Sequence, residues 1–218
     1  IFAWFVNHAV PPEYHEAAKK AGLPIHSYLE QEAAKQKPGE HGLLALDWWN
    51  GNRSTLVDAD LTGLLIGGTL STRAPDIYRA LIEATAFGTR VIIEAFEGRG
   101  VPVTEIIAAG GLPEKNALLK QIYADVTGRP FKLAGSPQAP ALGSAMHAAV
   151  AAGIYPNIEA AAETMGKLKD EVVQPIAANR PIYDQLYADY KTLYDTFGRG
   201  GNDVMKRLKA LRRASRGE

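Results

Sequence analysis

Hydrophobic positions recur at helical spacing over the longest patterned stretch of the chain, residues 73–100. This pattern predicts a central buried helix of about six turns. Arg79 and Glu83, four residues apart, are expected to form an ion pair on the side of that helix. The apolar positions that carry the pattern are Ile77, Leu81, Ala84, Gly88, Val91, Ile92, Ala95 and Phe96.

The stretch before this helix predicts a helical start followed by two strands. An aromatic cluster at residues 2–5 is closed by Pro11 and Pro12, which suit the first positions of a helix ending near Gly22. Residues 26–36 are polar and helix-like. Residues 42–50 and 61–70 are short apolar runs bounded by turn residues, so they predict two strands forming a hairpin edge on an α/β sheet.

The stretch after it predicts strand, glycine turn, helix, strand and further helices. Residues 104–108 are an apolar run that ends in Gly110 and Gly111, and residues 113–126 then follow helical spacing. A strand at 130–134 and a small-residue helix at 141–152 come next, and Asn157 is a candidate N-cap. A helix with a tyrosine stripe, interpreted as a clamp on the domain surface, precedes a basic tail from Asp203 that we expect to form a solvated, fraying helix. The stripe comprises Tyr183, Tyr187, Tyr190 and Tyr194.

Composition narrows the function classes. The 218 residues are 46% hydrophobic, and 24 Lys and Arg balance 24 Asp and Glu, so neither nucleic acid nor an anionic membrane is indicated as a partner. The sequence lacks Cys, which excludes disulfides and thiolate metal sites. No apolar run approaches 18 residues, so we expect a soluble protein.

The strand–glycine–helix stretch has chemistry of its own. Gly110 and Gly111 lack a Cβ, so a ligand can approach their backbone, and the following helix start offers unpaired N–H groups to an anion. A tight connection without a ligand uses the same residues, and the dipeptide alone leaves both interpretations open. Asp47 is an unfavourable candidate for a catalytic base because its strand has no supporting polar arrangement. The five His lack ligand spacing, so no metal-binding or catalytic residue is assigned in this chain.

The whole string GGLPEKNALLKQIYADVTGRPF resembles the adenosine-binding motif in the C-terminal domain of FGGY carbohydrate kinases. Further matches, among them LDWWNGNRS and ALGSAMHAAVAAGIY, resemble the ribulokinase branch of that family most closely. The resemblance implies an α/β, actin-like ATPase (ribonuclease H-like) domain with a mixed sheet and flanking helices. It implies one nucleotide-binding domain over 1–218, with a helical segment at 1–40 and C-terminal helices at 180–218.

The resemblance also implies roles for particular residues. Gly110 and Gly111 would face the ribose and phosphates of ATP, and Asn116 would contact the base or ribose. Leu112 and Lys115 would line the same pocket less directly. The family's general base and Gly-Thr phosphate loop lie upstream of the aromatic cluster, and Mg²⁺ is held mainly there. The chain, which begins at Ile1 within an apolar helix, is therefore expected to be an excised and inactive fragment.

The expected reaction of the full enzyme is ATP-dependent phosphorylation of a ketopentose, L-ribulose at its 5-hydroxyl, in cytoplasmic L-arabinose degradation. Two alternatives stay open: a kinase for xylulose, glycerol or another polyol, and a non-catalytic actin-like domain that senses a sugar or nucleotide. A homodimer is also left open.

Overall fold

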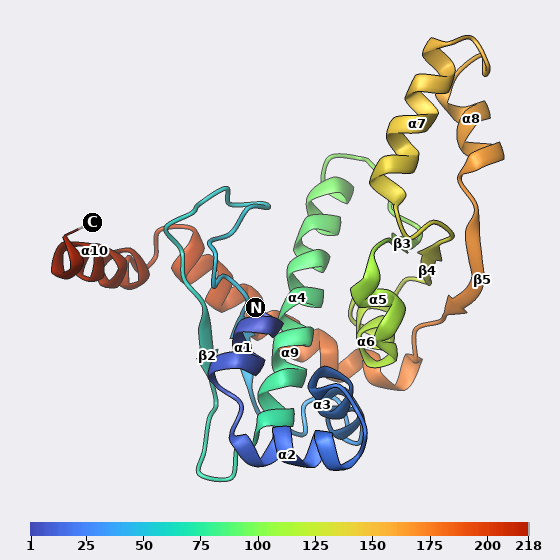
Figure 1. The fold of residues 1–218 in the computed structure, drawn as a ribbon. Helices are drawn as coiled ribbons and strands as arrows, with labels where there is room; N and C mark the ends of the chain where they lie inside the picture. The colour runs from blue at the N-terminus through green and yellow to red at the C-terminus, as the bar shows by residue number, and fades with distance from the viewer. Residues whose placement is uncertain (218) are drawn as a thin grey trace. The chain divides into compact units, whose positions relative to one another are not determined.

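The computed structural model describes residues 1–217, and the chain divides into two compact units (Figure 1). The first unit combines residues 1–102 with the segment from Ala177 onward, and the second is Val103–Ile176. The segment 1–40 is helical as predicted: it holds α1 (Phe2–His8), α2 (Pro12–Lys20) and α3 (Ile25–Ala34). The C-terminal helices are α9 (Arg180–Gly198), after the short 3-10 turn Ala177–Asn179, and α10 (Val204–Arg216).

The predicted central helix is confirmed as α4 (Ala74–Glu97), against which α1, α3 and α9 pack (Figure 1). Leu81, Ile82 and Phe87 on this helix are buried. The tyrosine stripe of α9 is buried as well, and the rings of Phe87 and Tyr190 lie 5.4 Å apart. The stripe therefore holds α9 in the core of this unit through aromatic packing.

The predicted ion pair between Arg79 and Glu83 is confirmed, but it lies in the core rather than on the side of the helix, because both side chains are buried. Nε of Arg79 donates to Oε1 of Glu83 at 2.9 Å, and Nη2 donates to the hydroxyl of Tyr183 at 3.1 Å. Nη1 donates to the carbonyl oxygens of Ala33 and Gln36. Those carbonyls lie at the C-terminal end of α3, where a helix leaves acceptors unpaired, so the arginine satisfies them from the neighbouring helix.

The two predicted N-terminal strands form a hairpin that is shorter than the apolar runs suggested. β1 (Leu44–Leu46) pairs antiparallel with β2 (Leu64–Ile66), with Leu44 opposite Ile66. Within the described residues these strands pair only with each other, so the predicted edge on a larger sheet was not found. All three β1 residues are buried, and β1 packs on α4 and α9.

The terminal helix α10 is largely exposed, as predicted, and side-chain contacts join it to the turn that precedes β2. Met205 is only 4% exposed, and Lys206 pairs with Asp58 at 2.8 Å. Lys209 and Arg213 both lie 3.1 Å from Oδ1 of Asp60. The basic residues of the tail therefore have acidic partners in a turn about 150 residues earlier in sequence.

The second unit is a three-stranded mixed sheet with helices. β3 (Ile106–Ala108) pairs parallel with β4 (Phe131–Ala134), and β4 pairs antiparallel with β5 (Leu168–Val173), a strand that the pattern did not predict. The helices are α5 (Gly111–Lys115), α6 (Ala117–Thr127), α7 (Ala139–Ala151) and α8 (Ile158–Met165). Asn157 caps α8 as predicted, since its Oδ1 accepts from the N–H of Ala160 at 2.9 Å. None of the described helices has the length and apolarity needed to cross a bilayer.

Candidate functional site

The glycine bend that the sequence singled out connects β3 to α5. Gly110 has φ 99°, a left-handed conformation that side chains other than hydrogen strain, so glycine is required there. A Cβ built on Gly110 or Gly111 would meet no atom within 4 Å. The bend is therefore open rather than plugged by side chains, which is the condition for close approach of a ligand to its backbone.

The single helix predicted after the bend is wrong, because Asn116 divides it in two. Asn116 is extended (φ −124°, ψ 98°) between α5 and α6. Its Oδ1 accepts from the backbone N–H of Leu119 at 2.7 Å, so Asn116 is the N-cap of α6 rather than a residue of the first turn. The side chain is buried at 4% exposure, and its amide NH₂ is the group left for contacts beyond the cap.

The other two predicted residues of this site lie at the surface. Leu112 is 47% exposed, and Lys115 is also exposed without an ion-pair partner among residues 1–217. Between them in sequence, Glu114 pairs with Lys169 of β5 at 2.8 Å, which connects the short helix α5 to the sheet. The structure thus groups the five predicted residues on one strand–helix–helix connection, with two glycines, a leucine and a lysine accessible and an asparagine buried.

Two buried charges beneath this connection were missed by the sequence reasoning. Lys120 of α6 is 7% exposed and donates to Glu171 of β5 at 2.5 Å. Asp125, also buried, accepts from the backbone N–H of Ile176 at 2.7 Å. Both lie between apolar positions of the α6 pattern, and that was the available signal, since a charge on a buried face needs a partner. They support the site by fixing α6 against β5 and the chain that follows it.

Asp47 lies immediately after β1 in the first unit and is a poor candidate for a base. A Cβ added to Gly88 would lie 3.8 Å from Oδ1 of Asp47 and 3.5 Å from the hydroxyl of Tyr190, so both groups face the same point on α4. Burial raises the pKa of Asp47 to about 6. Because its carboxyl group faces α4 and the hydroxyl of Tyr190, we assign no catalytic role to Asp47.

The described residues contain no group of three His, Cys, Asp or Glu side chains that could hold a metal ion. The nearest arrangement of a histidine and a carboxylate is structural: Nε2 of His41 lies 3.0 Å from Oε2 of Glu83, inside the buried network of α4. We therefore assign no metal ligand in residues 1–217.

Comparison with known families settles the family membership. The family model for the C-terminal domain of the FGGY family of carbohydrate kinases matches residues 1–152. The chain belongs to the FGGY family of carbohydrate kinases. The matched range includes all five residues of the glycine connection and the whole of α4.

Curated relatives of this FGGY chain are similar over nearly its full length. It is 59% identical over 216 residues to "Ribulokinase" of Halalkalibacterium halodurans, covering 97% of this chain and 38% of that protein. It is 53% identical over 212 residues to "Ribulokinase" of Mycolicibacterium smegmatis, covering 97% of this chain and 37% of that protein. The chain therefore spans less than two fifths of the length of these relatives.

Solved structures of FGGY kinases share the fold. A xylulose kinase from Rhodospirillum rubrum matches with TM-score 0.69 and 28% identity, covering 84% of this chain and 36% of that one. A gluconate kinase from Lactobacillus acidophilus matches with TM-score 0.69 at 21% identity, covering 80% and 35%. These neighbours confirm the predicted fold class, an α/β actin-like ATPase fold with a mixed sheet and flanking helices.

Proposed function

We propose that this chain, residues 1–218, is the ATP-binding C-terminal domain of a ribulokinase. The full enzyme would transfer the γ-phosphoryl group of ATP to the 5-hydroxyl of L-ribulose in cytoplasmic L-arabinose degradation. The observation that carries the proposal is 53–59% identity to ribulokinases over 97% or more of the chain. Membership of the FGGY family implies ATP as phosphoryl donor, usually with a divalent metal.

The open glycine bend supports the nucleotide role. Without a Cβ on Gly110 or Gly111, the ribose and phosphates of ATP can rest against the backbone. The NH₂ of Asn116 would donate to the base or ribose, and Leu112 would add apolar contact. The unpaired ammonium group of Lys115 would balance part of the phosphate charge. These contacts bind and orient the donor, which is the main contribution a protein makes to phosphoryl transfer.

The remaining parts of the reaction are assigned outside residues 1–217. No described residue is assigned as the base for the sugar hydroxyl, and no described cluster fits Mg²⁺. When bound, Mg²⁺ neutralises phosphate charge in such reactions. We propose that the base, the phosphate loop and the Mg²⁺ ligands belong to the rest of the enzyme, because relatives are more than twice the length of this chain. By itself the chain would bind ATP weakly and be inactive.

A kinase for another pentulose is the second candidate, favoured by the structural likeness to a xylulose kinase at 28% identity. Measuring kcat/KM of the full enzyme with L-ribulose and with xylulose separates the two. A higher value for xylulose would reject the ribulokinase assignment while leaving the nucleotide site in place.

Gly111→Ala is the sharpest test of the nucleotide site. Gly111 does not have a positive φ, and the added methyl group would meet no protein atom within 4 Å, so the variant should fold with unchanged stability. If ATP approaches this backbone, the methyl group occupies its space, and overpacking of about 1–3 kcal/mol should raise the KM for ATP roughly tenfold.

Gly68→Ala is the matched control. Gly68 is exposed after β2, also lacks a positive φ, and its added methyl group would also meet nothing within 4 Å. Steady-state kinetics of the full enzyme should show a wild-type KM for ATP in this variant. An unchanged KM in Gly111→Ala would remove the glycine bend from the nucleotide site.

A further inference from the structure

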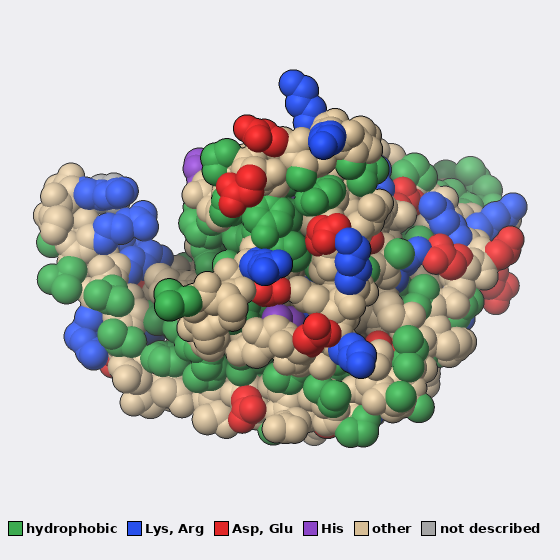
Figure 2. Space-filling model, turned by 90° about the horizontal axis from the view of Figure 1, so that it is seen from below, with side chains coloured by type: hydrophobic (Ala, Val, Ile, Leu, Met, Phe, Trp, Pro, Cys, Tyr) green, Lys and Arg blue, Asp and Glu red, His purple; other side chains and the backbone are tan. Residues whose placement is uncertain are grey.

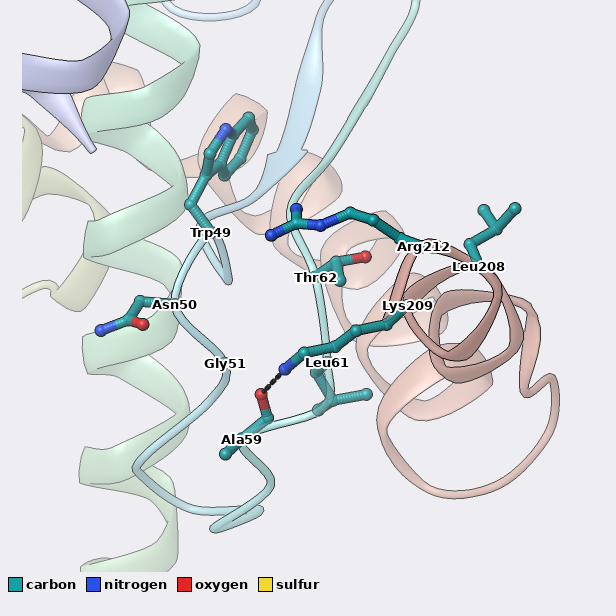
Figure 3. Close-up of a pocket in the computed structure, with 9 residues that line it drawn as sticks. All are labelled: Trp49, Asn50, Gly51, Ala59, Leu61, Thr62, Leu208, Lys209 and Arg212. Atoms are coloured by element: carbon teal, nitrogen blue, oxygen red, sulfur yellow. Dashed lines mark hydrogen bonds between the residues drawn. The ribbon is translucent and has the colours of Figure 1, made fainter. Parts of the chain in front are cut away.

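A cavity of about 340 Å³ lies in the first unit, between α10 and the segment from Trp49 to Thr62 (Figure 3). It falls within the size range of small-molecule sites. The nucleotide role proposed for the glycine bend does not use it. Its lining residues are Trp49, Asn50, Gly51, Ala59, Leu61, Thr62, Leu208, Lys209 and Arg212.

Among the described residues that line this cavity, Arg212 is a cation without an ion-pair partner. The negative charge of Asp60, next to the lining residues Ala59 and Leu61, is paired with two cations: Lys209 and Arg213 both contact its Oδ1 at 3.1 Å. Lys209 is held further by donating to the carbonyl oxygen of Ala59 at 2.5 Å. Arg212 has no ion-pair partner among the described residues, and Figure 3 shows its side chain extending from α10 towards Trp49 and Thr62. Basic side chains gather over α10 in Figure 2.

The other walls offer an apolar surface and hydrogen-bonding groups. Trp49 is fixed in place: a Cβ on Gly63 would lie 2.1 Å from its Cε3, so only glycine allows the indole to lie there. Its ring also lies 5.8 Å from that of Trp4. Thr62 contributes a hydroxyl group to the same lining, whereas the carboxamide of Asn50 points away from Arg212 (Figure 3).

A second cavity of about 390 Å³ shares some of its lining residues with the first. Asn50, Ala59 and Lys209 belong to both, and Arg53 adds another cation without an ion-pair partner in the described part of the chain. A guanidinium group can bind a phosphate through two parallel hydrogen bonds, and an indole can pack against the carbon skeleton of a sugar.

We propose that this cavity binds a small sugar phosphate, with Arg212 holding the phosphate, Trp49 packing against the sugar, and Thr62 bonding one of its hydroxyl groups. In a kinase this site would let a phosphorylated product or related metabolite bind to residues that do not belong to the glycine bend. The choice of a sugar phosphate rests on the proposed function. The anion site itself rests only on the unpaired arginine in its cavity.

The test is isothermal titration of the purified protein that carries this chain, without ATP, using a ketopentose 5-phosphate, inorganic phosphate and the unphosphorylated ketopentose. Arg212→Gln should weaken binding of the sugar phosphate at this site about tenfold or more, as loss of a charged hydrogen bond does. Thr62→Val, which keeps the side-chain volume, should weaken it by a smaller factor. Arg207→Gln is the matched control, since Arg207 is exposed on the same helix but does not line the cavity.

Retained binding in Arg212→Gln, or equal losses in Arg212→Gln and Arg207→Gln, would overturn the proposal. A loss of affinity in Arg212→Gln that is as large for the unphosphorylated sugar as for the sugar phosphate would overturn it as well, because the proposed active site binds that sugar in the wild type and the variant alike. Circular dichroism checks that each variant is folded. Because no ATP is present, a negative result here combined with a raised KM in Gly111→Ala would reject this site and leave the kinase assignment standing.

Discussion

Asn116 has one observed role, as the N-cap of α6, and one proposed role in nucleotide binding, and a pair of substitutions distinguishes them. Its Oδ1 caps α6 by accepting from the N–H of Leu119, whereas its NH₂ is the group proposed to contact the nucleotide. Asn116→Ala removes both functions. Asn116→Asp keeps a capping oxygen at the same place but replaces the NH₂ donor with a second acceptor.

The structure sets the expected magnitudes. Loss of an asparagine cap costs about 0.5–2 kcal/mol, and the 2.7 Å bond in a buried setting places Asn116→Ala in the upper half of that range. Asn116→Asp should keep the cap, because aspartate caps as well as asparagine, so any loss of stability should come from burying a carboxylate and should shrink as pH falls. A lost hydrogen bond to ATP should raise KM by up to about tenfold in both variants, with kcat nearly unchanged because such binding is uniform along the reaction.

Hydrogen exchange and steady-state kinetics measure the two roles on the same protein. In Asn116→Ala the amide of Leu119 should exchange about tenfold faster, whereas in Asn116→Asp it should stay protected. Both variants of the full enzyme should show a raised KM for ATP. A wild-type KM in Asn116→Asp would refute nucleotide contact, and unchanged protection of Leu119 in Asn116→Ala would refute the cap.

Two further predictions concern the core of the first unit. Glu83→Gln leaves the buried guanidinium group of Arg79 without its counter-charge, so it should lower the free energy of unfolding, measured by urea titration, by about 3–5 kcal/mol. Tyr183→Phe removes a neutral hydrogen-bond partner of Arg79 and should lower it by about 1–3 kcal/mol. A loss below about 1 kcal/mol in Glu83→Gln would contradict the buried network. Asp47 has a pKa raised from 3.8 to about 6, so its stabilising contribution is present below pH 4 and is lost as pH rises through 6. Asp47→Asn should therefore raise the free energy of unfolding by on the order of 3 kcal/mol relative to wild type at pH 7.5, and by little at pH 4. Thermal unfolding at the two pH values measures this difference. Equal gains in stability at both pH values would contradict the raised pKa.

The local sequence pattern was sufficient to predict a structural feature where that feature depends only on neighbouring residues. The spacing of apolar positions in α4 predicted a buried helix, and Asn157 was recognisable as a cap because a capping side chain acts within three residues. The glycines at 110 and 111 likewise marked the bend between β3 and α5. The same local reasoning failed at Asn116, because a helical apolar pattern continues across a break when the two helices share a buried face.

The sequence by itself determined most of the helices, the position of the glycine bend and, through the resemblance of its motifs, the kinase family. Tertiary structure alone decided which charges are buried: Arg79 looks like a surface partner of Glu83 in sequence, and only the carbonyls at the end of α3 explain its place in the core. It also decided that the basic tail is anchored, because Asp60 is brought to α10 from far along the chain. Helical periodicity is a property of residues a few positions apart, whereas the partner of a charge depends on where the folded chain brings distant segments together.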